Sequence, residues 1–381
     1  MSKKKEKAVL ILGSYGHTNI GDDLLMHNYV FLFRELGFEK IYTNVAVAGN
    51  VPEEIAKFVI MKETYNTSFL GWLNILKKVD VVCYGGGTIL KELYVSTSRS
   101  KYSVIIRMML FNLLAKILGK KVYNLNIGIG SITTFLGRLI IKIVLMSCNL
   151  SIFRDVDSFN YAKNELKINI NKICLGEDGL FINKKWHCNR SKDSLGSMPI
   201  KVGINVLYHI PDWVDREKYL EELRAFVNVV LERGFFVVFI PFQHSLCDNN
   251  DLAFIQRELL PYLKSKNYEL VNNVPISKLI KAFKEIDLFV GMRFHSLLMS
   301  ISTATPFLAI EYDTKCSRII KEYSYPFSVE IERLSCDLLL KKFDALLSNR
   351  EKTMDFLIKL GEDLYNKEFL CEKELWKKLE K

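Results

Sequence analysis

The chain has 381 residues, of which 49% are apolar and 25% are charged, a balance typical of a globular protein that excludes intrinsic disorder. The 53 Lys and Arg residues exceed the 43 Asp and Glu residues and give a formal net charge of +10. The basic residues are scattered and not interleaved with aromatics, so we expect no nucleic-acid partner. An anionic substrate or an anionic membrane surface accounts for the same excess.

Two further features bear on where the protein resides. The first apolar run, residues 8–12, is shorter than the ~7–15 residues of a secretory signal, and no stretch reaches the ~18 apolar residues of a spanning helix. We therefore expect a cytoplasmic protein, and a peripheral contact with the inner face of the membrane stays open. The eight cysteines form no C-x-x-C pair, so we expect reduced thiols and no metal site.

The first half of the chain alternates short apolar runs with helical patterns. The runs predict strands at residues 8–12, 40–46, 79–84, 122–127 and 150–153, and the helical patterns lie at residues 23–36, 103–118 and 136–146. Strands that alternate with helices in this way predict a parallel sheet that is covered by helices on both faces.

The alternation stops at residues 184–199, where polar residues, Gly and Pro cluster, and then starts again. It continues through residues 202–207, 216–232, 235–241, 251–260, 277–283, 287–290 and 307–312. We therefore expect an α/β fold with two Rossmann-like domains, residues 1–190 and 191–335, and a cleft between them. Residues 336–381 are expected to form charged helices that pack back across both domains.

Two glycine-rich turns follow predicted strands. The first runs from Gly13 through Asn19 to Asp22 and opens a helix, which suits an anionic ligand; the alternative is a simple strand–helix turn with Asp22 as the N-cap. The second turn is Gly85-Gly86-Gly87. Three consecutive glycines cost chain entropy on folding. Their presence is better explained by a close approach of the backbone to a ligand than by a packing contact between loops.

Charged residues follow two other predicted strands. Arg154 comes after residues 150–153, where it either holds a phosphate or carboxylate or forms a surface ion pair beside Asp155, the cap of the next helix. Arg293 and His295 follow residues 287–290, and in an extended chain both point to one side while the intervening residue faces the core. A fixed cation beside an imidazole suits anion binding coupled to proton transfer.

Lys315 and His244 complete the set of candidates. Lys315 is expected to start a helix beside the same cleft, with a solvated lysine as the alternative, and His244 follows the strand at residues 235–241 without an assignable partner. Residues 104–118 and 136–146 are apolar with interspersed Lys and Arg. They are better explained as helices that cover the sheet than as helices that lie on an anionic bilayer.

Together these segments resemble the polysaccharide pyruvyl transferase family over most of the chain, from Leu10 to Glu322. The resemblance is carried, in chain order, by Gly16-x-x-Asn19-x-Gly21-Asp22, Gly85-Gly86-Gly87, Arg154-Asp155-x-x-Ser158, Arg293-x-His295 and Tyr312-x-x-Lys315. The chain departs from the family at Asp178-Gly179-Leu180-Phe181, where the family often has Asp-Pro before an aromatic residue.

The resemblance implies a GT-B-like fold and a transferase of polysaccharide biosynthesis. Such an enzyme moves the enolpyruvyl group of phosphoenolpyruvate onto a sugar of a cell-surface polysaccharide precursor and forms a pyruvate ketal. The N-terminal domain would bind the acceptor, a nucleotide- or lipid-linked sugar, and the C-terminal domain the donor. Phosphoenolpyruvate is then a co-substrate, and neither a cofactor nor a metal is expected.

By position in the motifs, the donor-binding and catalytic residues of the family correspond to Arg293, His295, Arg154 and Lys315. The two arginines would hold the anionic groups of phosphoenolpyruvate, Lys315 would neutralise the departing phosphate, and His295 would act as general acid or base. The remaining residues expected to contact substrate are Gly85, Gly86, Gly87, Asn19, Asp22 and His244.

Two alternatives share this architecture. One is a GT-B glycosyltransferase that uses a nucleotide-sugar donor, and the other is a non-catalytic relative that binds a glycan or a membrane. The choice of donor separates the first alternative, and acceptor-dependent release of phosphate would exclude the second.

Overall fold

The computed structural model describes residues 6–64, 67–93, 100–186, 199–244, 249–272 and 275–380. The chain divides into two compact units, the first made of residues 1–17, 22–182 and 364–381, and the second of residues 18–21 and 183–363. The division after residue 182 lies close to the composition break in the sequence. Most of that break, the expected linker at residues 184–199, lies outside the described residues.

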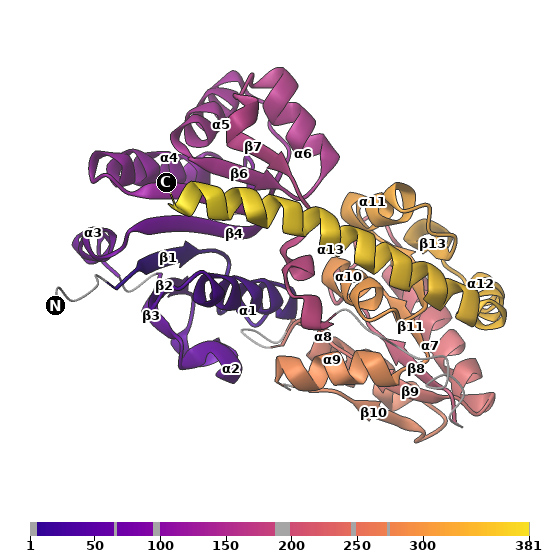
Figure 1. Cartoon of the computed structure of the whole chain (residues 1–381). Helices are drawn as coiled ribbons and strands as arrows, with labels where there is room; N and C mark the ends of the chain where they lie inside the picture. Colours follow the sequence, from indigo (N-terminus) through magenta and orange to yellow (C-terminus); the bar gives the residue numbers. More distant parts are fainter. Residues whose placement is uncertain are drawn as a thin grey trace. The chain divides into compact units, whose positions relative to one another are not determined.

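The first unit contains a seven-stranded sheet in the order β3-β2-β1-β4-β5-β6-β7, with all strands parallel (Figure 1). The order reverses between β1 and β4, as in doubly wound α/β folds. The strands are β1 (Ala8–Leu12), β2 (Lys40–Val45), β3 (Val59–Glu63), β4 (Val81–Leu90), β5 (Lys121–Ile129), β6 (Leu150–Phe153) and β7 (Ile173–Leu175). The helices are α1 (Ile20–Glu35), α2 (Glu53–Ala56), α3 (Phe69–Lys78), α4 (Ser103–Ile117), α5 (Phe135–Ser147), α6 (Val156–Asn160) and the end of α13 (Arg350–Glu380).

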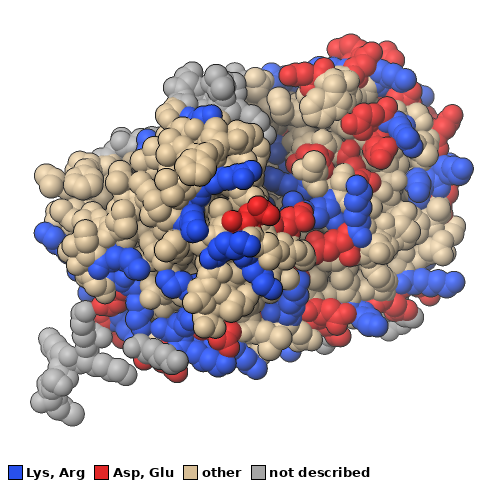
Figure 2. All heavy atoms as spheres, turned by 90° about the horizontal axis from the view of Figure 1, so that it is seen from above, with Lys and Arg blue, Asp and Glu red and all other residues tan. Residues whose placement is uncertain are grey.

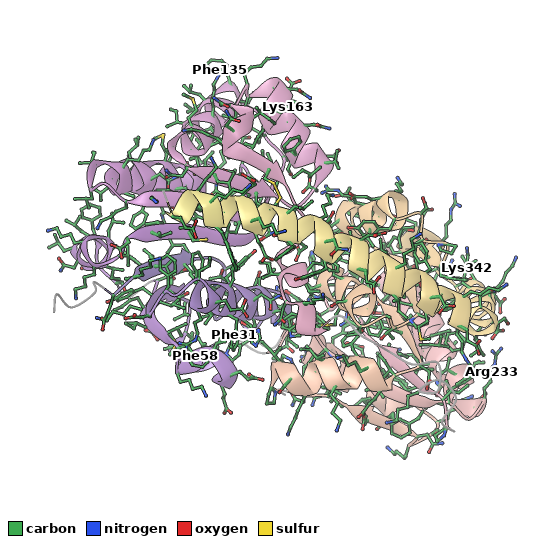
Figure 3. The ribbon with its side chains drawn as sticks, viewed as in Figure 1. Phe31, Phe58, Phe135, Lys163, Arg233 and Lys342 are labelled. Atoms are coloured by element: carbon green, nitrogen blue, oxygen red, sulfur yellow. A yellow bond between two sulfur atoms is a disulfide. The ribbon has the colours of Figure 1, made fainter. Side chains whose placement is uncertain are left out.

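The alternation of side chains along β1 divides the interior of this unit into two hydrophobic cores. Leu10 packs in the core that contains buried residues of α3, α4 and α5, whereas Val9 and Ile11 pack in the core that contains α1 and the end of α13. At the edge of the second core, the rings of Phe31 and Phe58 meet edge to face with centroids 5.8 Å apart (Figure 3). Helices therefore cover both faces of the sheet, as the alternating sequence predicts.

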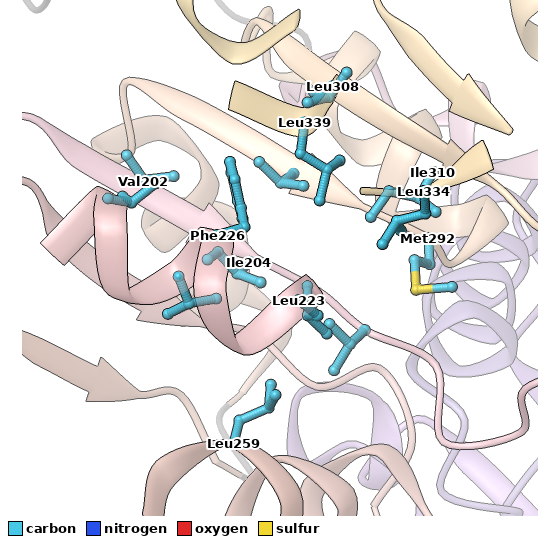
Figure 4. Packing of buried hydrophobic residues seen from close by; sticks show 14 of the residues in the cluster. Val202, Ile204, Leu223, Phe226, Leu259, Met292, Leu308, Ile310, Leu334 and Leu339 are labelled. Atoms are coloured by element: carbon cyan, nitrogen blue, oxygen red, sulfur yellow. The ribbon is translucent and has the colours of Figure 1, made fainter. Parts of the chain in front are cut away.

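The second unit repeats this plan with a six-stranded parallel sheet in the order β10-β9-β8-β11-β12-β13. Its strands are β8 (Lys201–Ile204), β9 (Phe236–Phe239), β10 (Tyr268–Leu270), β11 (Leu288–Gly291), β12 (Phe307–Glu311) and β13 (Ser328–Glu330). Its helices are α7 (Arg216–Glu232), α8 (Asp251–Phe254), α9 (Ile276–Glu285), α10 (Phe294–Ser302), α11 (Thr314–Glu322), α12 (Cys336–Ser348) and the start of α13. In the core, Ile204 lies near Phe226 of α7, and Leu339 of α12 packs in the same cluster (Figure 4).

Residues 336–381 are helical, as the sequence indicates. Helix α12 lies wholly within the second unit, whereas α13 begins there and its residues from Leu364 onward belong to the first unit. In that last part, Cys371 forms a disulfide with Cys174 of β7, so the expectation that all cysteines are reduced is wrong for this pair. Among the described residues, no helix is both long enough and apolar enough to cross a membrane.

Three local expectations differ from the structure. Strand β4 does not end at Tyr84 but continues through the three glycines to Leu90, with an irregular register after Gly87. Helix α1 begins at Ile20, so Asp22 lies in its first turn and is not its N-cap. The chain leaves the extended conformation after Arg293, which makes His295 the second residue of α10 and not a strand residue on the same side as Arg293.

Candidate functional site

The second unit holds half of the ten sequence-predicted site residues, namely Arg293, His295, Lys315, His244 and Asn19. The strand order reverses between β8 and β11, which pair with each other, and ligands of open α/β sheets bind beyond the strand ends at such a point. Asn205 follows β8 and Arg293 follows β11. The backbone N–H of Arg293 donates to Oδ1 of Asn205 at 2.9 Å, and this bond fixes where the arginine leaves the strand.

The guanidinium of Arg293 is anchored by a carboxylate that the sequence alone does not pair with it. Its Nε and Nη2 atoms donate to the two carboxylate oxygens of Asp251, at 2.9 and 2.6 Å, and Asp251 is completely buried. Nη2 also donates to Oε1 of Gln243 at 2.9 Å. Among the described residues, Nη1 has no hydrogen-bond acceptor, so two N–H groups remain for an anionic ligand.

Burial by itself would lower the pKa of Arg293, but the charge and hydrogen bonds of Asp251 outweigh burial and raise the pKa. The ring of Tyr208 lies 5.7 Å from the guanidinium carbon and covers one of its sides. The arginine is thus a permanent cation held in a fixed orientation, which is the arrangement that recognition of a phosphate or carboxylate requires.

His295 lies directly against the backbone of Gly21. A Cβ atom placed on Gly21 would come within 2.1 Å of Nδ1 of His295, so only glycine leaves room for the imidazole. Gly21 belongs to a short segment, residues 18–21, that packs as part of the second unit. The spacing Asn19-x-Gly21 in the sequence is therefore explained by a contact with a residue more than 270 positions later.

This segment is held by backbone pairing with the loop after β9. The N–H of Ile20 donates to the carbonyl of Phe242 at 2.9 Å, and the N–H of His244 donates to the carbonyl of Thr18 at 3.1 Å. The side chain of Asn19 accepts from the N–H of Gly21 at 3.0 Å, so it closes a local turn. Asn19 therefore shapes the loop on which His295 rests.

His244 is partly buried beside this segment. Burial lowers the pKa of His244, which keeps the imidazole neutral near pH 7. Its Nδ1 atom is buried, and among the described residues it has no hydrogen-bond partner. A ligand reaches this atom only if the surrounding residues move, so the expected substrate contact of His244 stays a prediction.

Lys315 lies in the first turn of α11, after the neighbouring strand β12. Asp313 caps this helix, because its Oδ1 atom accepts from the N–H groups of Lys315 and Cys316. The Cys316 thiol donates to the carbonyl of Met292 at 3.1 Å and ties the start of α11 to the end of β11. Lys315 and Arg293 therefore follow adjacent parallel strands at the same edge of the sheet.

The first unit places its glycine-rich turns at its own switch point, between β1 and β4. Tyr15, in the first turn, donates its hydroxyl to the carbonyl of Gly85 at 3.1 Å. A Cβ atom on Gly85 would collide with the rings of Tyr15 and Tyr29, and one on Gly86 would collide with Leu25. These two glycines are thus explained by packing against Tyr15 and α1, whereas a Cβ on Gly87, at φ +82°, would make only an ordinary contact with Ile89.

Asp22 follows in the first turn of α1, where a negative charge is favourable. Its neighbour Asp23 is the more unusual carboxyl of the pair. Burial and the charge of Asp22 raise the pKa of Asp23 to about 8, so it is largely protonated at neutral pH.

Arg154 lies in the first unit, where it forms an internal ion pair. Its Nη1 donates to Oδ2 of Asp178 at 2.9 Å and its Nη2 to Oγ1 of Thr88 at 2.8 Å, and its side chain is only 6% exposed. Asp155 caps α6 by accepting from the N–H of Ser158, as the sequence indicates. Asp178 and Thr88 therefore hold the Arg154 guanidinium inside the first unit, and its expected contact with the donor stays a prediction.

Near this ion pair, the end of α13 inserts buried carboxyl groups. Glu368 accepts from the N–H of Glu177 at 2.7 Å, and Lys367 pairs with the Glu177 carboxylate. Burial raises the pKa of Glu368 to about 7, and burial together with the charges of Glu368 and Glu35 raises the pKa of Glu372 to about 8. No spacing in the sequence relates Glu177 to these helix residues.

Asn205 and Asp251 are the two residues of the second-unit edge that sequence reasoning missed. Asn205 carries a signal, a polar residue within the apolar run at residues 202–207, but Asp251 lies 42 residues from its partner in an ordinary helix start. Among the described residues, no group of three His, Cys, Asp or Glu side chains could hold a metal ion.

Solved structures match this arrangement of two Rossmann-like units. UDP-GlcNAc 2-epimerase from Neisseria meningitidis, bound to UDP-GlcNAc, has a TM-score of 0.64 at 11% identity, covering 97% of this chain and 100% of that chain. The Methanocaldococcus jannaschii epimerase has a TM-score of 0.58 at 14% identity, covering 90% and 92%. Anabaena HepE, in complex with UDP and glucose, has a TM-score of 0.59 at 7% identity, covering 98% and 100%. The fold is therefore GT-B-like, as the sequence resemblance implies.

The family follows from the sequence itself. The model of the polysaccharide pyruvyl transferase family matches residues 19–314, and the chain belongs to this family. The match begins at Asn19 and includes Arg154, Arg293 and His295, and Lys315 lies one residue beyond it. None of the curated proteins matches the sequence.

Proposed function

We propose that the protein transfers the enolpyruvyl group of phosphoenolpyruvate to a sugar of a polysaccharide precursor and closes a cyclic pyruvate ketal. Its membership of the pyruvyl transferase family supports the reaction class. The proposal that this unit binds the donor depends on Arg293, a partly buried cation whose Asp251 anchor leaves the two N–H groups of Nη1 for an anion. The donor site is therefore assigned to the carboxyl edge of the second unit.

The residue types of this edge fit the two charges of phosphoenolpyruvate. Arg293 holds one anionic group through Nη1, and Lys315, after the next strand, neutralises the departing phosphate. Asn205 and Asp251 do not bind the donor but keep the arginine in place. In this proposal, side-chain cations held in fixed positions stabilise the negative charge of the departing phosphate.

The chemistry needs one proton donor or acceptor, and His295 is assigned this role. A proton adds to the methylene carbon, and the first sugar hydroxyl forms a bond to the central carbon as it gives up its proton. The bond from that carbon to the phosphate oxygen breaks, and phosphate leaves with the electron pair. The second hydroxyl then bonds to the same carbon and releases its proton, so the products are the ketal and inorganic phosphate.

The acceptor is proposed to be a sugar carried by a nucleotide or a lipid. The titles of two fold neighbours name bound UDP-GlcNAc or UDP and glucose, and a similar fold here is compatible with a nucleotide-linked sugar. The same likeness also favours the second candidate, a glycosyltransferase with a nucleotide-sugar donor. Family membership makes pyruvyl transfer the stronger proposal.

Binding of phosphoenolpyruvate is the first test, because it does not require the acceptor to be known. Calorimetry with the full chain should show binding of phosphoenolpyruvate that is lost in R293Q, whereas UDP- and GDP-sugars should not compete for it. Binding of nucleotide sugars but not of phosphoenolpyruvate, with release of nucleotide on turnover, would establish the glycosyltransferase instead.

Turnover provides the second test. Phosphate release should depend on added nucleotide- or lipid-linked sugars, and the acceptor should gain the mass of a pyruvate ketal. His295→Ala should lower the rate ~10²–10⁴-fold, the usual contribution of acid–base catalysis. The matched control is His209→Ala, which removes an exposed histidine of the same unit and should leave the rate unchanged. An unchanged rate in His295→Ala would refute the role of His295.

A further inference from the structure

Two helices of the first unit expose a row of large apolar side chains. Helix α4 exposes Leu110, Leu113 and Ile117, and α5 exposes Phe135, Leu136, Leu139 and Met146. These seven residues are called the α4–α5 face. Ile117 and Phe135 are 81% and 83% exposed, and Phe135 lies at the outer edge of the unit (Figure 3). An exposed apolar surface of this extent marks a contact with a partner.

The two helices lie side by side, so the seven residues form one surface. Tyr102, just before α4, donates to Thr134, just before α5, at 3.0 Å, and Asn112 donates to Ser147 near the other ends at 3.0 Å. The opposite sides of both helices pack in the same core on the sheet. The α4–α5 face is therefore the outer layer of the unit on this side.

The two helices of this face carry basic residues and no carboxylate, and the nearby carboxylate of Glu92 accepts hydrogen bonds from Thr133 and Thr134 at the start of α5. Residues 100–154 contain eight Lys and Arg and no Asp or Glu, so these 55 residues carry eight of the ten net positive charges of the chain. Arg107, Lys116 and Arg138 are exposed on the two helices. On the left of Figure 2, where α4 and α5 lie, tan residues dominate with Lys and Arg between them. The partner must therefore be both apolar and anionic.

We propose that the α4–α5 face docks on the surface of a lipid bilayer that contains anionic lipids. The apolar side chains would enter the boundary between head groups and acyl chains, and the flanking basic residues would contact lipid phosphates. The absence of carboxylates on α4 and α5 removes the charge repulsion that an anionic surface would otherwise exert. This proposal rests on the first unit alone and is independent of the donor site.

A second copy of the chain is the less suitable occupant. In a symmetric dimer the same face meets itself, which would bring Arg107, Lys116 and Arg138 near their own copies without a carboxylate from either helix. An anionic bilayer instead provides a counter-charge for every basic residue. The one-sided charge thus distinguishes a lipid surface from self-association.

The test is sedimentation of the full chain with vesicles. One set contains phosphatidylcholine alone and the other contains roughly one third phosphatidylglycerol, enough to give a negative surface potential. We expect binding to the anionic set, weakening as salt is added, and at least tenfold weaker binding to the neutral set. Equal binding to both sets, or no binding to either, would overturn the proposal.

Variants then test which surface makes the contact. I117S/F135S and R107Q/R138Q should each weaken binding roughly tenfold or more, because each removes two apolar or two charged contacts. The controls are Leu370→Ser and Arg333→Gln, which change an exposed apolar and an exposed basic residue elsewhere and should bind as the parent does. Binding that survives both double variants would overturn the assignment of the face.

Self-association is measured in the same samples. Sedimentation equilibrium without vesicles should give the mass of one chain for the parent and for I117S/F135S if the face binds lipid. A dimer that dissociates in I117S/F135S would overturn the proposal in favour of a second copy. Because neither readout uses catalysis, failure here would leave the pyruvyl transfer proposal to its own test.

Discussion

The two units have the same strand order up to their sixth strand, yet the side chains at their switch points differ in kind. In the first unit, Tyr15 and Tyr29 fill the space beside Gly85, and Arg154 is enclosed in an ion pair with Asp178. In the second unit, Asp251 anchors Arg293 on one side and leaves the N–H groups of Nη1, and His295 is the second residue of the helix that follows. The shared topology provides a place for a site, and the residues after each strand decide whether that place is filled by the protein or left for a ligand.

The largest effect is expected at Arg293. Arg293→Ala removes the ligand contact and also leaves the buried carboxylate of Asp251 without its cation, which costs about 3–5 kcal/mol. We expect phosphate release to fall below detection and the free energy of unfolding, measured in denaturant, to drop by that amount.

The two losses are separated by the double variant R293Q/D251N. It replaces the ion pair by neutral side chains of similar shape, so stability should recover toward that of the parent while phosphoenolpyruvate binding stays lost. Recovery of binding together with stability would show that Arg293 acts only through the fold.

Arg154 provides the matching experiment in the first unit. Arg154→Ala should also destabilise the fold by about 3–5 kcal/mol, because Asp178 is left buried and charged. In R154Q/D178N both stability and the rate of phosphate release should return to within about tenfold of the parent, measured by unfolding and turnover, if Arg154 is structural. If the double variant is folded but has no turnover, the result would support the contact with substrate that the family motif implies for Arg154.

A smaller effect is expected at Gly21. Gly21→Ala places a methyl group against Nδ1 of His295 and must displace the imidazole. We expect kcat to fall roughly 10–100-fold, since misplacing a catalytic group by about 1 Å can cost ~10² in rate. Gly49→Ala is the control, because a Cβ there meets no atom, and a normal kcat in Gly21→Ala would argue against His295 as the acid or base.

The smallest effect is a change of stability with pH that belongs to the first unit. Glu368 and Glu372 have pKa values of about 7 and about 8, raised first of all by burial. The folded state holds these protons more tightly than the unfolded state. The contribution of the two groups to the free energy of unfolding is therefore fully present below about pH 4.5. It is lost as pH rises through 7 and 8.

In E368Q/E372Q this loss should disappear. Denaturant unfolding should show the variant and the parent to be similar near pH 4.5, and the variant to be more stable by about 2 kcal/mol or more at pH 8.5. Glu362→Gln changes an exposed carboxylate of α13 and should keep the pH dependence of the parent. If the free energy of unfolding changes with pH in the same way in E368Q/E372Q and in the parent, these two groups are not the source of the pH dependence.

The sequence predicts most of this fold because the long elements carry their own patterns. Strands β1 and β6 and helix α7 have the expected bounds, and the α/β alternation gives parallel sheets in both units. The strands β3, β7, β10 and β13 were missed. All four lie at the edge of a sheet and have only three to five residues, and there pairing with a neighbour and not periodicity defines the strand.

The site is less predictable, because its geometry depends on contacts between distant segments. The family motifs single out Arg293 and His295, but nothing in their spacing identifies Asp251 as the anchor or Gly21 as the surface under the imidazole. Likewise, Arg154 and Arg293 are both arginines that follow a strand. Only the hydrogen bonds of Arg154 to Asp178 and Thr88 distinguish the surroundings of the two. The types and order of the residues indicate that a site exists. Which cations can contact a ligand depends on how each one is buried in the fold.

The way the first unit is assembled from separate stretches of chain has a consequence for its biosynthesis. Residues 22–182 leave the ribosome long before residues 364–381, which complete one of the unit's cores and supply the partner of Cys174. During translation the first unit therefore stays incomplete, with part of its hydrophobic core exposed, until the whole of the second unit has been synthesised. A nascent chain halted before residue 364 should therefore hold a finished second unit beside an unfinished first one.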